Sequence, residues 1–301
     1  MIVDSVEPAQ SKPQRTCVLC QSTRFDPLPS EKLAHLCKCA GCGLVSVRNF
    51  PEPEQLRAIY SADYFKNSAS SVMGYDDYEQ DRQCIARTAA RRLVDIEKKM
   101  GPGRLLDVGC ALGFFIEEAQ RRGWTVEGID ISAHAARYAA DKVGVPARVG
   151  LLRDAQFEKG SFDAITMWDV IEHVADPVAE LALCRELLRP GGLLVLSTPD
   201  VGSLVAKVTG PRWMGFKLAE EHLYYFSRQT MARSLEKAGF EIIDVTGIGK
   251  DVALDFFARR LGMYLPAVSG ILGRAFKLFH LDSTTVYVNP HDIMQMVVRR
   301  P

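Results

Sequence analysis

The sequence predicts an α/β fold in which a doubly wound, mostly parallel seven-stranded sheet follows a small cysteine-rich module. From Arg104 onward, strand-like and helix-like patterns alternate, which is typical of a parallel sheet with helices on both faces. The run 105–113 has the pattern of a buried strand, a tight glycine-containing turn and the start of a helix. Near the N-terminus, two C-x2-C pairs have the spacing of a metal site.

Apolar patterns and breakers place each element. Strands are predicted at 105–108, 125–129, 147–149, 162–167, 193–197, 241–245 and 286–299. Helices are predicted at 114–122, 132–142, 177–188 and 228–238. Before the first strand, the stretch 78–100 lacks proline and glycine and carries Ile85, Ala89, Leu93 and Ile96 at helical spacing. This stretch is expected to form one long amphipathic helix.

Composition divides the chain into four parts. Residues 1–14 are polar and contain proline, which predicts a flexible tail. A zinc ribbon is expected at 15–50 and a helical connector at 51–100. The catalytic domain follows at 101–301, with a helical insertion at about 250–281 that packs over the mouth of the site or forms a dimer face. A peripheral membrane contact of this insertion is the alternative, and the chain is expected to be a monomer or a homodimer.

The overall composition disfavours several classes of protein. The 37 basic residues balance 37 acidic ones, so nothing indicates nucleic acid or another polyanion as a partner. No apolar run approaches the roughly 18 residues that are needed to cross a bilayer, and the first residues lack the pattern of a signal peptide. The sequence therefore predicts a soluble, cytoplasmic protein in which the eight cysteines do not form disulfides.

The cysteine spacing C-x2-C-x18-C-x2-C predicts one structural zinc, with the ligands Cys17, Cys20, Cys39 and Cys42. Cys37 is a competing thiol, but only Cys39 has the two-residue spacing to Cys42. Because four protein ligands close the coordination shell, this zinc is not expected to take part in catalysis.

The turn after the first predicted strand indicates a site for a nucleoside cofactor. Small residues at Gly109, Ala111 and Gly113 allow backbone to approach a ligand closely. Asp130 stands 21 residues after Gly109, at the end of the second strand, where its carboxylate can accept hydrogen bonds from a ribose diol. A dinucleotide site would require G-x-G-x-x-G, and Phe114 stands where the third glycine would fall. The turn therefore disfavours NAD.

With Asp107 just before it, the turn resembles the first motif of class I S-adenosylmethionine-dependent methyltransferases. The stretches 161–177 and 187–193 resemble that family's fourth strand with its following loop and its turn into the fifth strand. The resemblance extends over 104–245 and implies a Rossmann-like fold that binds S-adenosylmethionine. It implies that backbone around Gly109 holds the methionine end and that Asp130 holds the ribose. The other implied contacts are Ile131 and Leu152 beside the adenine, and Trp168 and Asp169 near the methionyl end.

The stretches 60–65, 74–78 and 221–227 resemble a subfamily that joins an N-terminal zinc ribbon to this catalytic domain. Such enzymes methylate small hydroxylated molecules, such as sugars, glycan precursors and natural-product precursors, on oxygen or sometimes on carbon. The resemblance therefore implies a small hydroxylated acceptor.

His222 is the predicted general base. It follows the fifth strand, on the acceptor side of a sheet of this topology, and a histidine that titrates near neutral pH suits removal of a hydroxyl proton. In relatives the corresponding histidine lies near the acceptor. His173, beside the fourth strand, is the competing candidate, and a packing role for His222 is the alternative.

Three other interpretations stay open. Asp169, Glu172 and His173 resemble the Glu-x-x-Glu-His set that binds a divalent ion in ubiquinone-pathway and small-RNA methyltransferases, although Asp at the first position shortens the reach. An RNA methyltransferase would use the ribbon to bind RNA, but the basic excess there is weak and the Asn/Asp-Pro-Pro-Tyr motif is absent. The presence of Asp107, Gly113 and Asp130 argues against a non-catalytic binding protein.

Overall fold

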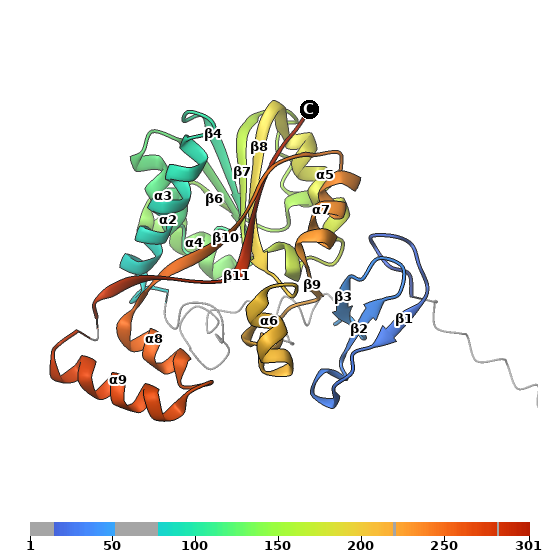
Figure 1. Cartoon of the computed structure of the whole chain (residues 1–301). Coiled ribbons are helices and arrows are strands. Elements are labelled where there is room, and N and C mark those ends of the chain that lie inside the picture. The colour runs from blue at the N-terminus through green and yellow to red at the C-terminus, as the bar shows by residue number, and fades with distance from the viewer. Residues whose placement is uncertain (1–14, 52–77, 219–220, 282) are drawn as a thin grey trace, which may run out of the picture.

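The computed structural model describes residues 15–51, 78–218, 221–281 and 283–301 (Figure 1). The predicted tail at 1–14, most of the predicted connector, the stretch 60–65 and residues 74–77 of the stretch 74–78 lie outside the described residues. Within the described part, two sheets form: a larger one from Arg104 onward and a smaller one that contains the cysteine-rich module (Figure 1).

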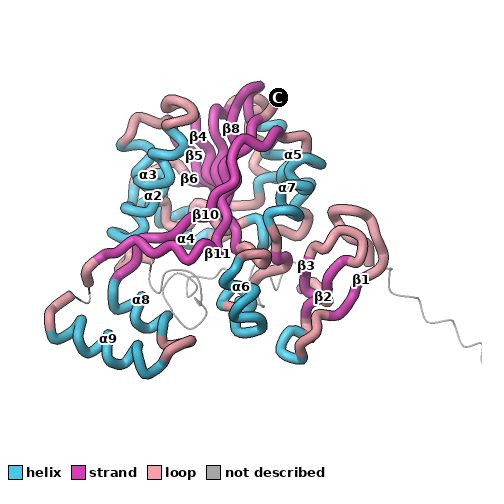
Figure 2. Tube along the Cα trace, in the orientation of Figure 1, coloured by secondary structure: helices cyan, strands magenta, loops and turns pink. Residues whose placement is uncertain are grey.

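The larger sheet confirms the predicted fold class. Its strands are β4 (Arg104–Val108), β5 (Thr125–Asp130), β6 (Ala147–Val149), β7 (Phe162–Trp168), β8 (Leu188–Pro199), β10 (Glu241–Ala253) and β11 (Thr285–Arg299). They follow the order β10-β11-β8-β7-β4-β5-β6. Figure 2 shows β10 and β11 running out of this sheet towards α8 and α9. The pairs from β8 to β6 are parallel, and β11 is antiparallel to both of its neighbours. The carboxyl ends of β4, β5, β7 and β8 therefore meet at one edge, where a doubly wound sheet binds its ligand.

Helices cover both faces of this sheet (Figure 1). One layer contains α2 (Arg82–Glu97), α3 (Phe114–Arg121) and α4 (Ala133–Tyr138), and the other contains α5 (Pro177–Leu187) and α7 (Arg228–Lys237). Each face of the sheet has its own hydrophobic core, and adjacent residues of β4 contribute to both. Leu105 packs in the core that contains α2 and α3, and Leu106 packs in the core that contains α5 and α7. Successive side chains of a strand point to opposite faces, so one buried strand stabilises both layers.

The smaller sheet contains β1 (Phe25–Pro27), β2 (Leu36–Cys39), β3 (Val45–Val47) and β9 (Tyr224–Tyr225), in that order. Its first three strands come from the cysteine-rich module. The fourth comes from the segment between α6 (Leu204–Thr209) and α7, far along the chain. The module is therefore joined to the rest of the protein by strand pairing.

Several predicted boundaries are wrong. The helix predicted at 78–100 is α2, which begins at Arg82 after a turn at 78–81. The helix predicted at 132–142 is α4 followed by a π-helical turn, Ala139–Val143, which ends where Gly144 adopts a φ of +81°. No helix was predicted at α6, where the Ser203 hydroxyl accepts a hydrogen bond from the Ala206 amide and so caps the first turn.

The strand predicted at 241–245 continues as β10 to Ala253, because its pairing with β11 resumes after two register shifts and ends at Ala253 and Thr285. At Gly249 a side chain would overlap the Val288 carbonyl, so glycine allows the two strands to stay close. The insertion predicted at about 250–281 is helical only in α8 (Leu254–Leu261) and α9 (Pro266–Leu278), at the far ends of β10 and β11 (Figure 1). Ile271, Leu278 and Phe279 are exposed there.

Among the described residues, no helix is both long and apolar enough to cross a membrane.

Candidate active site

The turn between β4 and α3 requires its glycines. Gly109 and Gly113 have φ values of +75° and +85°, and a side chain at Gly109 would overlap that of Val170. Ala111 also adopts a positive φ, +47°, which is uncommon for a residue with a side chain. The amides of Gly109 and Cys110 both donate to the Ile129 carbonyl, at 2.8 and 3.1 Å, so the turn is fixed against the end of β5.

Asp130, the last residue of β5, holds this turn from the other side. Its Oδ2 accepts from the Ala111 amide at 2.9 Å, and its Oδ1 accepts from the Ser132 amide at 2.8 Å. Burial raises the pKa of Asp130, and the two amide hydrogen bonds offset part of that effect. Each carboxylate oxygen keeps a further lone pair that can accept a hydrogen bond from a ligand.

Asp107 is buried at the end of β4, where the Thr166 hydroxyl donates to its Oδ1 at 2.6 Å. Desolvation raises the pKa of Asp107 to about 7, although Thr166 and Arg92 act in the opposite direction. Asp107 therefore links β4 to β7 beneath the glycine turn.

A pocket opens beside this turn, between α2 and the carboxyl ends of β4 and β7. Five predicted cofactor residues line it: Asp107, Gly109, Ala111, Trp168 and Asp169. The other four, Gly113, Asp130, Ile131 and Leu152, do not line it. Leu152 is instead buried in the core cluster that contains α5. The structure thus brings together the residues expected at the methionyl end and not those expected beside the adenine.

Arg92 of α2 lines the same pocket and was not predicted. Its guanidinium carbon lies 4.2 Å from the centre of the Trp168 ring. Its Nε and Nη2 atoms are buried, and neither has a hydrogen-bond partner among the described residues. A buried donor without a partner is costly, so these two nitrogens are suited to an anionic group of a ligand. The sequence feature that could have indicated Arg92 is its position beside the apolar face of the predicted helix.

Lys250 of β10 is the second cation of the pocket, where it pairs with Asp169. It was missed because the strand was predicted to end at 245.

On the other side of Asp169, three residues form a second group: Glu172 and His173 from the 3₁₀ turn Ile171–His173, and His222. The rings of His173 and His222 meet edge to face, with centres 4.7 Å apart. Each ring has its Nε2 atom 4.0 Å from Glu172 Oε1. One potential ligand atom from each residue lies within 4.8 Å of the others. Asp169 is not part of this group. The divalent-ion ligand set that was predicted from Asp169, Glu172 and His173 therefore contains His222 instead of Asp169.

Burial controls the charges of this group. Desolvation and the charge of Asp169 raise the pKa of Glu172 to about 8, although the nearby Thr198 side chain acts in the opposite direction. Neither carboxylate oxygen has a partner in good hydrogen-bond geometry among the described residues. Desolvation lowers the pKa of His173 to about 4, although its Nδ1 atom lies 2.9 Å from the Glu221 carbonyl. Desolvation and His173 lower the pKa of His222 well below its usual value. His222 was expected to titrate near neutral pH, but burial keeps it uncharged there.

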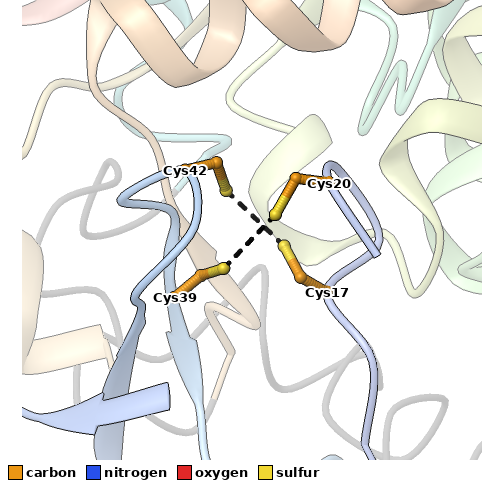
Figure 3. Close-up of side chains that lie close together, drawn as sticks. All are labelled: Cys17, Cys20, Cys39 and Cys42. Atoms are coloured by element: carbon orange, nitrogen blue, oxygen red, sulfur yellow. Dashed lines mark hydrogen bonds between the residues drawn. The ribbon is translucent and has the colours of Figure 1, made fainter. Parts of the chain in front are cut away.

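The four predicted zinc ligands converge at one point in the N-terminal module (Figure 3). The sulfur atoms of Cys17 and Cys42 are 3.6 Å apart, and those of Cys20 and Cys39 are 3.5 Å apart. Tetrahedral zinc with Zn–S bonds of about 2.3 Å places its sulfurs about 3.8 Å apart, so the group needs only a small expansion to hold the ion. Burial raises the pKa of Cys39, but the amides of Cys42 and Gly41 and the neighbouring thiols bring it down to about 7.

Cys37 lies outside this group. Its sulfur accepts a hydrogen bond from Arg15 Nη1 at 3.1 Å and faces the Ser46 carbonyl at 3.7 Å. The preference for Cys39 over Cys37 agrees with this arrangement.

A glycine turn, a carboxylate at the end of the next strand and a pocket at the carboxyl edge of a parallel sheet define a nucleoside-cofactor-dependent enzyme of the Rossmann-like class. Residues 78–245, more than half of the 301 residues, match the family model described as a methyltransferase domain. The chain belongs to this family and is an S-adenosylmethionine-dependent methyltransferase.

Curated relatives carry O-methyltransferase names. The chain is 34% identical over 170 residues to the ubiquinone biosynthesis O-methyltransferase of Xanthomonas axonopodis pv. citri (strain 306), a match that covers 52% of this chain and 71% of that protein. It is 32% identical over 166 residues to the protein of the same name from Xanthomonas euvesicatoria pv. vesicatoria (strain 85-10), covering 52% of this chain and 70% of that protein.

Solved structures share the fold at low identity. An S-adenosylmethionine-dependent methyltransferase from Archaeoglobus fulgidus has a TM-score of 0.51 and 15% identity, covering 74% of this chain and 98% of that one. Geranyl diphosphate C-methyltransferase from Streptomyces coelicolor A3(2) has a TM-score of 0.50 and 18% identity, covering 83% of this chain and 100% of that one. At these identities the likeness establishes the fold alone.

Proposed function

We propose that this methyltransferase acts on a hydroxyl oxygen of a small acceptor, with His222 as the general base. The observation that carries the proposal is the uncharged imidazole of His222 beside His173 and Glu172, next to the pocket residue Asp169. An uncharged imidazole has a lone pair that can take the hydroxyl proton as the oxygen attacks a methyl group. The O-methyltransferase names of the curated relatives support oxygen as the methylated atom.

The residues of the pocket fit S-adenosylmethionine, which supplies an electrophilic methyl group on a sulfonium when bound. We assign the ribose to Asp130 and the methionine amine to the region of Gly109. Arg92, with two buried donors that need acceptors, is assigned to the methionine carboxylate. The face of the Trp168 ring holds the Arg92 guanidinium in place by a cation–π contact. Ile131 and Leu152 remain the proposed neighbours of the adenine.

A structural zinc ion held by Cys17, Cys20, Cys39 and Cys42 completes the proposal. The convergence of four sulfurs supports it. Domain limits of 15–50 for this module and 101–301 for the catalytic part are proposed with it, and the family match begins inside the predicted connector.

The acceptor class is tested by turnover. Purified protein is incubated with S-adenosylmethionine and three groups of acceptors: sugars and nucleotide-linked sugars, phenols and catechols, and matched deoxy or O-methylated analogues that lack the free hydroxyl. Formation of S-adenosylhomocysteine only with free hydroxyls supports O-methylation. Product methylated at carbon, or turnover on RNA alone, overturns it. We propose sugars and glycan precursors as the first group to test.

A divalent cation at Glu172, His173 and His222 is a second candidate feature of the acceptor side. Two buried carboxylate oxygens without partners and two uncharged histidines offer oxygen and nitrogen ligands within 4.8 Å of one another. A cation bound there would polarise the acceptor hydroxyl in place of proton removal by His222.

A further inference from the structure

The two-residue strand β9 belongs to the cysteine module by its hydrogen bonds. It pairs antiparallel with β3, with Val45 opposite Tyr225 and Ser46 opposite Tyr224. The Val47 amide extends the ladder by donating to the Leu223 carbonyl at 3.0 Å. The Phe50 ring packs on Tyr224, with ring centres 5.5 Å apart.

The same segment is bonded on its other side to the proposed acceptor site. The Leu223 amide donates to the Glu172 carbonyl at 2.9 Å, and the Glu221 carbonyl lies 2.9 Å from His173 Nδ1. His222 stands between these two contacts. The segment 221–225 therefore has the cysteine module on one side and the Glu172–His173 turn on the other.

The proposed zinc ligands shape the part of the module that contacts this segment. Cys39 is the last residue of β2, Cys42 lies in the turn that follows, and β2 pairs with β3 from Leu36 opposite Val47 to Lys38 opposite Val45. The loop between Cys17 and Cys20 is held separately, because Lys237 of α7 donates to the carbonyls of Val18 and Leu19 at 3.1 and 2.9 Å.

Buried side chains make this connection continuous. One core cluster contains residues of the module and of the segment: Cys17, Leu19, Leu36, Cys39, Val45, Val47, Leu223, Tyr224, Tyr225 and Phe226. The pocket that holds Arg92 and Gly109 has none of them in its lining. The cluster also contains Leu152, a proposed neighbour of the adenine, but none of its residues lines that pocket. The direct connection between the module and the segment 221–225 therefore does not involve a residue of the pocket lining.

We propose that the four-cysteine module positions the segment 221–225, so that zinc binding by the cysteines sets the placement of His222 and Glu172 but not the affinity for the cofactor. The proposal rests on the proposed acceptor-side role of His222. The module is then a positioning device, and its residues touch neither the cofactor nor the acceptor.

The test compares full-length wild type with Cys20→Ser, which removes the most exposed ligand, and with Cys37→Ser, which replaces a cysteine of the same module that is not a proposed ligand. Zinc content, amide hydrogen exchange, S-adenosylmethionine affinity and turnover are measured on each. We expect Cys20→Ser to lose the zinc and to exchange the Leu223 and Val47 amides about tenfold faster or more. Its cofactor Kd should stay within about twofold of wild type, and its turnover should fall by roughly tenfold to a hundredfold. Cys37→Ser should keep the zinc and the wild-type values.

Three results would overturn the proposal: wild type without zinc, unchanged exchange at Leu223 after zinc loss, or loss of cofactor binding together with the zinc. Lys237→Met provides a second variant with all four ligands intact. It should retain zinc and speed exchange in the loop between Cys17 and Cys20, with a smaller effect at Leu223. If exchange changes as expected but His222→Ala keeps full turnover, the coupling stands and the role of His222 fails. The two failures are therefore distinguishable.

Discussion

Lys250 Nζ lies 2.8 Å from Asp169 Oδ2, and this ion pair joins β10 to the end of β7 inside the pocket beside the glycine turn. The Ser197 hydroxyl donates to the other oxygen, Oδ1, at 2.8 Å. Burial would raise the pKa of Asp169, but the charges of Lys250 and Arg92 and the hydrogen bonds from Lys250 and Ser197 hold it well below its usual range. Asp169 is therefore ionised at neutral pH. Lys250 lies beyond residues 78–245, which match the family model. The part of β10 outside that match therefore supplies the cation that pairs with Asp169 in the pocket.

Asp169→Asn should lower the free energy of unfolding at pH 7 by about 1–2 kcal/mol, because it removes the carboxylate that pairs with Lys250, and partial exposure of the pair limits the effect. A carboxylate whose pKa is lowered by folding stabilises the folded state at any pH above the pKa that it has in the unfolded chain. This stabilisation is lost as the pH falls towards the pKa of the folded state. The difference from wild type should therefore shrink below about pH 4. Urea denaturation across pH measures it. Asp95→Asn, which breaks the exposed pair with Lys98, is the control and should cost less than about 0.5 kcal/mol. Equal effects of the two variants would contradict the assignment.

Arg92→Met should weaken S-adenosylmethionine binding by roughly tenfold to a hundredfold, the equivalent of one or two charged hydrogen bonds. Calorimetric titration measures the change. Arg87→Met removes the same charge from an exposed position of the same helix and should leave the affinity within about twofold. A cofactor analogue without the carboxylate provides the decisive comparison, because Arg92→Met and wild type should bind it alike. If Arg92→Met weakens the analogue as strongly, Arg92 does not contact the carboxylate.

The sheet could be predicted from the sequence because its signals are local. Alternating patterns, the proline and glycine breakers and the glycine turn all lie within about ten residues of the element that they specify. Each of the seven predicted strands is present, with small shifts at most of their ends. The four-cysteine group was equally accessible, because two-residue spacing fixes which thiols can approach one ion.

The missed features depend on contacts between distant segments. β9 has two residues and forms only because β3 offers an edge, so no local pattern marks it. Lys250 reaches the pocket because β10 continues past Gly247 and Gly249 to Ala253, through pairing with β11, whereas the strand was predicted to end at 245. The lowered pKa of His222 results from its burial beside His173, and neither burial nor that contact is visible in the order of residues.

Glu172→Gln should change how stability depends on pH. Burial raises the pKa of Glu172 in the folded protein to about 8, above the usual value of 4.5, so the fold favours the uncharged carboxyl. The stability that the folded state gains from keeping Glu172 protonated is fully present below about pH 4.5 and is lost as the pH rises to about 8. Wild type should therefore lose melting temperature relative to Glu172→Gln between pH 5 and pH 8, in buffer freed of divalent cations. A constant difference across this range would show that Glu172 is not buried as an acid.

The same pair of proteins tests the second candidate feature. If Glu172, His173 and His222 bind a divalent cation, adding Mg²⁺ or Mn²⁺ at pH 8 should restore the melting temperature of wild type and leave that of Glu172→Gln unchanged, since binding to the folded state alone stabilises it. If the melting temperature of neither protein changes on addition of the cation, the hypothesis of a divalent cation at Glu172, His173 and His222 is wrong.

His222→Ala should lower turnover by roughly 10² to 10⁴ while S-adenosylmethionine affinity stays within about twofold, because removal of a general base affects proton transfer and not cofactor contacts. The acceptor found in the turnover panel is used under single-turnover conditions. Tyr225→Phe is the matched control: the Tyr225 ring lies 5.7 Å from that of His222, centre to centre, and its buried hydroxyl has no hydrogen-bond partner among the described residues. It should keep near wild-type turnover.

Three comparisons then separate the roles at this site. A large loss in His173→Ala with little loss in His222→Ala would make His173 the base. Because the pKa of His222 is well below its usual value of 6.5, a decline of turnover that comes from protonation of His222 should lie below pH 6.5. A decline centred near pH 6.5 would mean that the base is an exposed histidine or that the acceptor rehydrates the site. Near wild-type turnover of both histidine variants would leave them as packing residues, and alignment of an already acidic hydroxyl would account for the reaction.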